Sequence, residues 1–155
     1  MEEIIAALKT LLADMVSFKF RVHGAHWNVE GDDFTQYHAF FEEIYTDADS
    51  SIDPIAEYIR KLGDYAPFTL ARFLELRSIQ DSAPTGSDDE SLTLDVYNAN
   101  KFILAELFEV YRKAEAAGLP NLSNFIADRI DMQQKWDWQL RVSLKDFEEP
   151  MSNEQ

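Results

Sequence analysis

The sequence predicts an all-α protein of one domain, residues 1–155: a bundle of four long amphipathic helices, with a short extra helix in the connection between the second and the third. Two observations predict this class. Apolar residues recur at steps of three and four through long stretches of the chain, which is the spacing of one helical face. No stretch keeps the strict alternation of a half-buried strand. The length of 155 residues also suits a single buried core.

The first half of the chain predicts two long helices. One is expected over residues 2–28, and its apolar stripe consists of Ile4, Leu8, Leu11, Met15, Phe18 and Val22. The other is expected over residues 34–62, after the turn sequence EGDD, in which Gly31 is available for a turn and an aspartate for an N-cap. Pro54 lies inside this second helix. Because proline lacks the amide proton, we expect a kink or a new first turn there.

The second half predicts one short helix and two long ones. The short helix is expected within residues 68–80, and a polar loop follows over residues 81–91. The long helices are expected over residues 92–117 and 122–147, separated by GLPN, in which glycine ends one helix and proline precedes the next. Residues 149–155 are expected to form a flexible tail.

The composition is strongly acidic and contains no cysteine. Twenty-nine Asp and Glu oppose fourteen Lys and Arg, which gives a net charge of −15. Such a surface repels phosphate backbones and attracts cations. The absence of cysteine excludes disulfides, thiolate metal sites and thiol nucleophiles. The acidic first residues do not read as a signal peptide, and no apolar run is long enough to cross a bilayer. We expect a cytoplasmic protein with no membrane association.

All three histidines fall within sixteen residues, at His23, His26 and His38. His26 lies near the end of the first helix and His38 near the start of the second, so antiparallel packing places the two rings at about the same height. Glu42 follows His38 by four residues, on the same helical face. Imidazole together with carboxylate is a ligand set for iron, zinc or manganese. One such histidine is often only a core residue, but two beside a carboxylate favour a metal site. His23 is either a further ligand or a solvated neighbour.

Asp53 and Glu57 form a second carboxylate pair with the same four-residue spacing. At 1.5 Å per residue, Asp53 lies roughly 22 Å along the helix from His38. One chain cannot bring these groups together. If the second helices of two copies pack antiparallel about a twofold axis, His38 of one copy approaches Asp53 and Glu57 of the other, and two identical sites form.

The segments HWNVEGDDF, YHAFFEEIY and DPIAEYI resemble the Dps family, the miniferritins of the ferritin-like superfamily. The resemblance covers the whole chain, including the late Trp138. The Glu-x-x-His motif of ordinary ferritins is absent. The resemblance implies a ferritin-like four-helix bundle that assembles into a hollow dodecamer. It also implies that the protein oxidises Fe(II) with hydrogen peroxide or dioxygen, stores ferric mineral in the cavity and protects against oxidative damage.

The same resemblance implies residue roles. It divides the ligands of a ferroxidase site, mononuclear or di-iron, between two subunits: His26, His38 and Glu42 from one, and Asp53 and Glu57 from the other. Zinc or another divalent metal could take the place of iron. Trp27 matches the tryptophan that the family uses as an electron donor. Position 42 is usually aspartate in the family, and glutamate reaches one methylene further.

Two departures from the family pattern matter. Many relatives bind DNA through a lysine-rich N-terminal tail, whereas this sequence begins MEEIIAAL and ends DFEEPMSNEQ, so we expect no DNA binding. Relatives often line an iron-entry pore with aspartates near the start of the last helix. Here Asn121 and Asn124 stand in that region, and Asp128 is the suggested pore acid.

Three other functions stay open on the sequence alone. The protein could be a metal-binding or storage cage with weak or no ferroxidase activity. The feature that suggests this is Glu42, a glutamate where the family usually has aspartate. It could be a mononuclear iron oxygenase that uses His26, His38 and Glu42 and acts as a monomer. It could also be a structural bundle without metal, although the histidine spacing argues against that.

Overall fold

The computed structural model describes residues 1–147, so the expected tail over residues 149–155 lies outside the described residues. The helices are α1 (Glu2–Asn28), α2 (Phe34–Lys61), α3 (Leu70–Leu76), α4 (Asp89–Ala116) and α5 (Pro120–Ser143), followed by a 3-10 turn, η1 (Leu144–Phe147). The described residues contain no strand, only an isolated bridge between Glu30 and Asp88. The predicted all-α class and the short extra helix are therefore confirmed.

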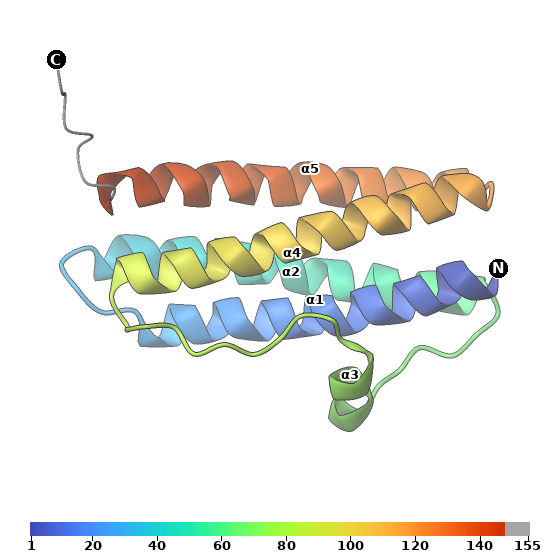
Figure 1. Ribbon diagram of the computed structural model, residues 1–155, viewed down its shortest axis with the longest axis horizontal. Helices are drawn as coiled ribbons and strands as arrows, with labels where there is room; N and C mark the ends of the chain where they lie inside the picture. Colours follow the sequence, from blue (N-terminus) through green and yellow to red (C-terminus); the bar gives the residue numbers. More distant parts are fainter. Residues whose placement is uncertain (148–155) are drawn as a thin grey trace, which may run out of the picture.

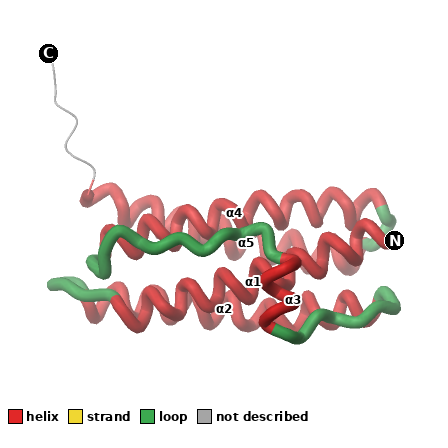
Figure 2. The backbone as a smooth tube through the Cα atoms, turned by 60° about the horizontal axis from the view of Figure 1, so that its bottom comes forward, coloured by secondary structure: helices red, strands yellow, loops and turns green. Residues whose placement is uncertain are grey.

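The four long helices lie side by side as a bundle (Figure 1). α1 and α2 run antiparallel and are joined by a short turn, and α4 and α5 form a second antiparallel pair. A long connection leaves the end of α2, forms α3 outside the bundle and returns along its length to the start of α4 (Figure 2). Because of this crossover, α2 and α4 run in the same direction.

The core forms where the predicted apolar stripes meet. In α1 every predicted stripe residue is buried: Ile4, Leu8, Leu11, Met15, Phe18 and Val22. The same core contains apolar side chains of α2 and α4, chiefly Phe41, Ile44, Ile55, Ile59, Val96, Ile103, Leu107 and Val110. Burying one such side chain stabilises the fold by about 1.5–3 kcal/mol relative to leaving it exposed. Thus the apolar periodicity explains why these three segments pack as helices.

Helix α4 begins three residues earlier than the sequence predicted. The Asp88 carboxylate accepts hydrogen bonds from the backbone N–H of Ser91 at 2.9 Å and from its hydroxyl at 2.8 Å. This N-cap satisfies donors that the first turn would otherwise leave unpaired. Acidic residues in that first turn also suit the positive end of the helix dipole. Helix α5 likewise begins early, with Pro120 in its first turn.

Of the two outcomes expected at Pro54, a new first turn is not seen. α2 runs as one helix from Phe34 to Lys61 with Pro54 inside it. The hydroxyls of Ser50 and Ser51, in the preceding turn, donate to the carbonyls of Asp47 and Ala48. The distance along α2 between its first and last turns is therefore that of a continuous helix.

The connection from α3 to α4 is tied to the bundle by side chains of α1. One oxygen of the buried Asp14 carboxylate accepts the backbone N–H groups of Ser78 and Ile79 at 2.7 and 3.0 Å. Arg21 donates to both oxygens of Asp95 and to Ser82 in the connection. The return path of the crossover is thus held by charged groups rather than by secondary structure.

Among the helices in the described part of the chain, none is both long enough and apolar enough to cross a membrane.

Candidate metal centre

The structure brings His26 and His38 into direct contact. Their rings stack with centroids 3.7 Å apart and planes 18° apart. Nδ1 of His26 lies 2.7 Å from the carbonyl oxygen of His38, and Nδ1 of His38 lies 2.7 Å from the carbonyl oxygen of His26. A carbonyl oxygen only accepts, so Nδ1 carries the proton in both rings. In the neutral rings, both Nε2 atoms therefore keep a lone pair for a metal ion.

This reciprocal pairing follows from the turn between α1 and α2. Gly31 has a φ of +130°, a conformation that side chains other than glycine rarely adopt. The N–H of the neighbouring Glu30 donates to the carbonyl of Ser87 at 2.8 Å, which fastens the turn to the segment before α4. The chain therefore reverses over a few residues, and the last turn of α1 meets the second turn of α2.

His23 lies beside this pair but faces other rings. It stacks on Tyr45 at 4.1 Å between centroids and contacts Trp27 at 4.4 Å. Tyr45 also meets the His26 ring edge-on at 5.2 Å. Burial, together with the nearby charges of Lys19 and His26, holds the pKa of His23 below its ordinary value. These effects favour the neutral form of the His23 ring, which packs against aromatic neighbours.

The predicted carboxylate ligands do not join the histidines within one chain. Glu42, Asp53 and Glu57 are all exposed on α2. Nowhere in residues 1–147 do three His, Asp or Glu side chains gather in a way that could hold a metal ion. The expected convergence of Glu42 with His26 and His38 is therefore not seen among the described residues of the single chain. Asp53, fifteen residues beyond His38 on a continuous helix, lies roughly 22 Å away along its axis.

The suggested pore acid, Asp128, is exposed on α5, and the first turn of that helix carries no acidic residue. Its role stays a prediction.

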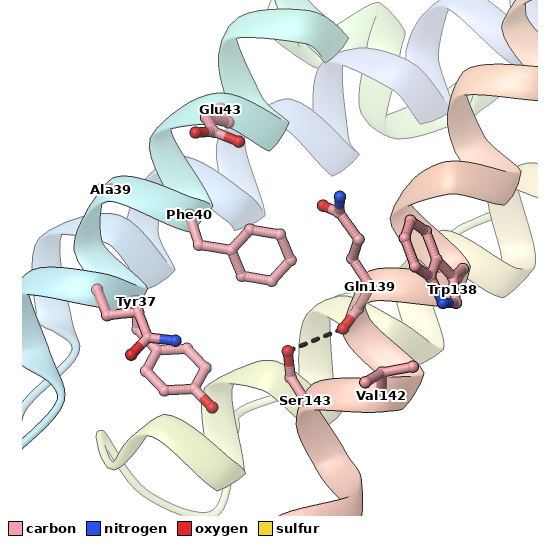
Figure 3. Close-up of a pocket in the computed structure, with 9 residues that line it drawn as sticks. Tyr37, Ala39, Phe40, Glu43, Trp138, Gln139, Val142 and Ser143 are labelled. Atoms are coloured by element: carbon pink, nitrogen blue, oxygen red, sulfur yellow. Dashed lines mark hydrogen bonds between the residues drawn. The ribbon is translucent and has the colours of Figure 1, made fainter.

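A separate groove lies between α2 and α5 (Figure 3). Its volume is about 500 Å³, and it is lined by Tyr37 and Phe40 from α2 and by Trp138, Gln139 and Val142 from α5. Trp138 was noted in the sequence only as a late tryptophan. The groove is mostly apolar and contains none of the predicted ligands.

A buried ion pair that the sequence did not reveal joins α2 to α5. Arg129 donates two hydrogen bonds of 2.9 Å to the two oxygens of Asp47, and the indole N–H of Trp136 donates to the same carboxylate at 2.8 Å. Burial by itself raises the pKa of Asp47, but the hydrogen bonds from Arg129 and Trp136 outweigh it and hold the pKa below its ordinary value. The charged carboxylate thus anchors the middle of the helix that carries His38.

The bundle, its crossover and its paired histidines define the class of the protein as ferritin-like. The family model described as "Ferritin-like domain" matches residues 5–149. A "DNA protection during starvation protein" from Helicobacter pylori is 30% identical over 137 residues, which cover 88% of this chain and 95% of the relative. The "DNA protection during starvation protein 2" of Bacillus anthracis is 29% identical over 143 residues, covering 92% and 97%.

Solved structures agree with these sequence matches. The crystal structure of a Dps protein from Vibrio cholerae O1 is similar with a TM-score of 0.87 and 29% identity, covering 92% of this chain and 89% of the other. The chain belongs to the Dps family of ferritin-like proteins.

Proposed function

We propose that this protein is a miniferritin that oxidises Fe(II), with hydrogen peroxide as the main oxidant, and stores the ferric product inside a hollow dodecamer, protecting a cell against oxidative damage. Membership of the Dps family supports the proposal. The Vibrio cholerae relative is described as a member of a broad superfamily of ferritin-like diiron-carboxylate proteins. The net charge of −15 suits a shell that attracts and holds cations.

The observation that carries the proposal is the reciprocal pairing of His26 and His38. Each ring donates Nδ1–H to the other residue's carbonyl, so both rings are held with Nε2 available. Imidazole nitrogen beside carboxylate oxygen is a donor set for iron, and zinc is the common competitor.

A second copy of the chain completes the site in this proposal. Within one chain, the continuous α2 helix keeps Asp53 and Glu57 far from the histidines. When two α2 helices pack antiparallel about a twofold axis, His26, His38 and Glu42 of one copy meet Asp53 and Glu57 of the other. The symmetry makes two equivalent sites for each pair of chains.

The chemistry divides between the two kinds of ligand. Two Fe(II) ions each give up one electron, and the two electrons break the O–O bond of hydrogen peroxide and leave two hydroxide ions. Hard carboxylate oxygens favour the more highly charged Fe(III) product. The neutral imidazoles hold it less firmly, so the product can leave for the cavity. Consuming Fe(II) and peroxide together prevents their reaction to hydroxyl radical elsewhere.

The test measures assembly and oxidation in the same preparation. We expect a dodecamer in solution and a rapid rise in ferric absorbance when Fe(II) and hydrogen peroxide are added. The double variant His26→Ala/His38→Ala and the double variant Asp53→Ala/Glu57→Ala should both lose the rapid phase. Glu109→Ala, an exposed acid on α4 that pairs with Arg112 and Lys113, is the matched control and should keep it.

A cage that stores metal with little oxidation is the second candidate, and the observation that favours it is Glu42. This glutamate is exposed and stands where the family usually has aspartate. A dodecamer that oxidises iron no faster than the histidine variant would support this candidate, and Glu42→Asp should then raise the rate. A monomer would contradict both proposals, because the two halves of the site could not meet.

A further inference from the structure

The carbonyl of His26 is available to the histidine pair because α1 ends just before its next bond would form. In an α-helix each N–H donates to the carbonyl four residues earlier. The last bond of this kind at the end of α1 runs from Val29 to Ala25, at 3.1 Å. The next would run from Glu30 to His26, but the N–H of Glu30 donates to the carbonyl of Ser87 instead, at 2.8 Å. Thus one donor has two candidate acceptors, and the structure pairs it with the one that is more distant in the sequence.

The acceptor left free in this way fixes the His38 ring. Nδ1 of His38 lies 2.7 Å from the carbonyl oxygen of His26 and donates its proton to that oxygen. Free neutral histidine side chains prefer the other tautomer, with the proton on Nε2. If the Glu30 N–H returned to the helix, it would compete for the same carbonyl, and His38 would lose the bond that holds its proton on Nδ1. The proton would then occupy Nε2, the atom that a metal ion needs.

The segment before α4 is built to hold the Ser87 carbonyl in place. The carboxylate of Asp88, the next residue, accepts the backbone N–H of Ser91 at 2.9 Å and its hydroxyl at 2.8 Å. The hydroxyl of Thr85 donates to the Ser91 hydroxyl oxygen at 3.1 Å. Gly86 leaves room for this cap, because a Cβ atom at that position would lie 2.5 Å from an oxygen of the Asp88 carboxylate. Side-chain bonds thus fix the backbone on both sides of residue 87.

We propose that Asp88 is a positioning residue of the metal centre. Its cap keeps the Ser87 carbonyl where this acceptor withdraws the N–H of Glu30 from α1. The carbonyl of His26 is thereby reserved for the other histidine ring. This inference rests on the proposed function and deepens it, because the tautomer matters only where both rings bind metal. It gives the end of the crossover connection a role in the metal centre, besides joining α2 to α4.

The experiment reads the tautomer directly in the assembled, metal-free protein. Isotope-labelled histidine is incorporated, and solid-state NMR of the sedimented assembly distinguishes a protonated Nδ1 from a protonated Nε2. The chain has three histidines, and His38→Gln identifies the signal of that ring. We expect its proton on Nδ1 in the unchanged protein. In Asp88→Ala, we expect most of the His38 signal to shift to the Nε2-protonated form and the dissociation constant for Co(II), measured by visible absorbance, to rise several-fold.

Two matched variants separate this effect from charge and from stability. Asp88→Asn removes the charge but keeps an oxygen for the cap, so the His38 signal and the Co(II) affinity should stay as in the unchanged protein. Ile103→Val shortens a fully buried side chain in the middle of α4, lowers stability and should leave both readings unchanged. An Asp88→Asn protein as altered as Asp88→Ala would show that charge is the cause and would overturn the proposal.

Proline at position 30 provides the most specific comparison. Glu30→Pro removes the N–H for which the two carbonyls compete, and proline is common directly after a helix C-cap. The preceding Val29 is already extended, with φ −60° and ψ 136°, as a residue before proline prefers. In the double variant Asp88→Ala/Glu30→Pro, the proton should therefore return to Nδ1 of His38. The double variant Asp88→Ala/Glu30→Ala keeps the N–H and should stay defective.

The outcomes separate this inference from the proposed function. The tautomer is read without metal, and iron oxidation is measured on the same proteins. Absence of iron oxidation from the unchanged protein would overturn the proposed function and the inference with it. Normal oxidation with the same His38 signal in Asp88→Ala would overturn the inference alone, as would a double proline variant as defective as Asp88→Ala. If the proline variants fail to assemble, Gly86→Ala decides, because its methyl group displaces the same cap without a change of charge: a shifted His38 signal supports the proposal, and an unchanged signal contradicts it.

Discussion

The Asp47–Arg129 pair is a buried contact on which the stability of the fold is expected to depend strongly. Only 8% of the Arg129 side chain and 17% of the Asp47 side chain are exposed. Removing the carboxylate leaves the guanidinium buried without its counter-charge. We expect Asp47→Ala to lower the free energy of unfolding by about 3–5 kcal/mol, the range measured when one partner of a buried pair is removed. Urea unfolding at a fixed protein concentration measures the loss.

The exposed pair Arg112–Glu109 on α4 provides the comparison. Both side chains are largely in solvent, so Glu109→Ala should change the free energy of unfolding by no more than about 1 kcal/mol. Equal losses in Asp47→Ala and Glu109→Ala would contradict the importance assigned to burial.

The Asp47–Arg129 pair also predicts how the stability of the fold falls at acid pH. The folded-state pKa of Asp47 lies below its ordinary value of 3.8. Its contribution to stability is therefore present above that ordinary value and is lost as the pH falls through the folded-state pKa. Unfolding midpoints measured across this acid range should fall more steeply for the unchanged protein than for Asp47→Asn.

At the residue scale, the sequence could predict a contact between residues that are close in the chain, but not a contact between residues that are far apart in it. The approach of His26 and His38 followed from their symmetric positions about one short turn, and it is confirmed. The exchange of Nδ1 bonds depends on ring orientation, which spacing does not specify. Asp47 and Arg129 are 82 residues apart, so no periodicity could connect them.

At the scale of the elements, the crossover connection is held by a buried carboxylate of α1, Asp14, whose charge is unfavourable there. One oxygen of this carboxylate accepts two backbone N–H groups, and the other has no hydrogen-bond partner among the described residues. Burial raises its pKa despite the bonds from Ile79 and Ser78. Glu106 has a raised pKa as well, through burial and then through the charge of Asp14. The charged form of Asp14 is thus unfavourable in the fold.

This predicts a stabilising substitution. The variant Asp14→Asn keeps an oxygen for the two N–H groups and carries no charge at this position, so we expect a gain of about 1 kcal/mol at neutral pH. Because the folded-state pKa of the carboxyl is raised, its contribution to stability is fully present below 3.8 and is lost as the pH rises. The gain should therefore shrink on acidification, as measured by urea unfolding. Asp14→Ala, which leaves both N–H groups without an acceptor, should instead lose about 2 kcal/mol.

Element boundaries were less predictable than element existence. The apolar stripes identified all four long helices because burial imposes their spacing. They could not show that Asp88 caps α4, since a cap depends on one side-chain geometry. A new first turn at Pro54, one of the two predicted outcomes, is not seen: a proline costs one hydrogen bond and some crowding, and α2 continues through it while its apolar face is buried on both sides of the proline.

At the scale of the whole molecule, net charge decides which partners are repelled. The Helicobacter pylori relative is called a DNA protection protein, but removing Fe(II) and peroxide protects DNA without contact. With a net charge of −15, we expect no retardation of duplex DNA in a gel-shift assay at about 50 mM salt, where phosphate contacts are strongest. The same protein carrying an added lysine stretch is the positive control. Retardation of the unchanged protein that disappears at high salt would contradict this expectation.

The continuity of α2 has a genetic consequence. Because one helix separates the histidines from Asp53 and Glu57, a chain that lacks either group remains able to supply the other. If two copies share each site as proposed, a histidine-deficient copy and an acid-deficient copy, each expected to be inactive alone, form mixed pairs with one intact site and one doubly damaged site. Random mixing of equal amounts should restore about one quarter of the sites. Two defective alleles expressed in one cell would thus complement each other.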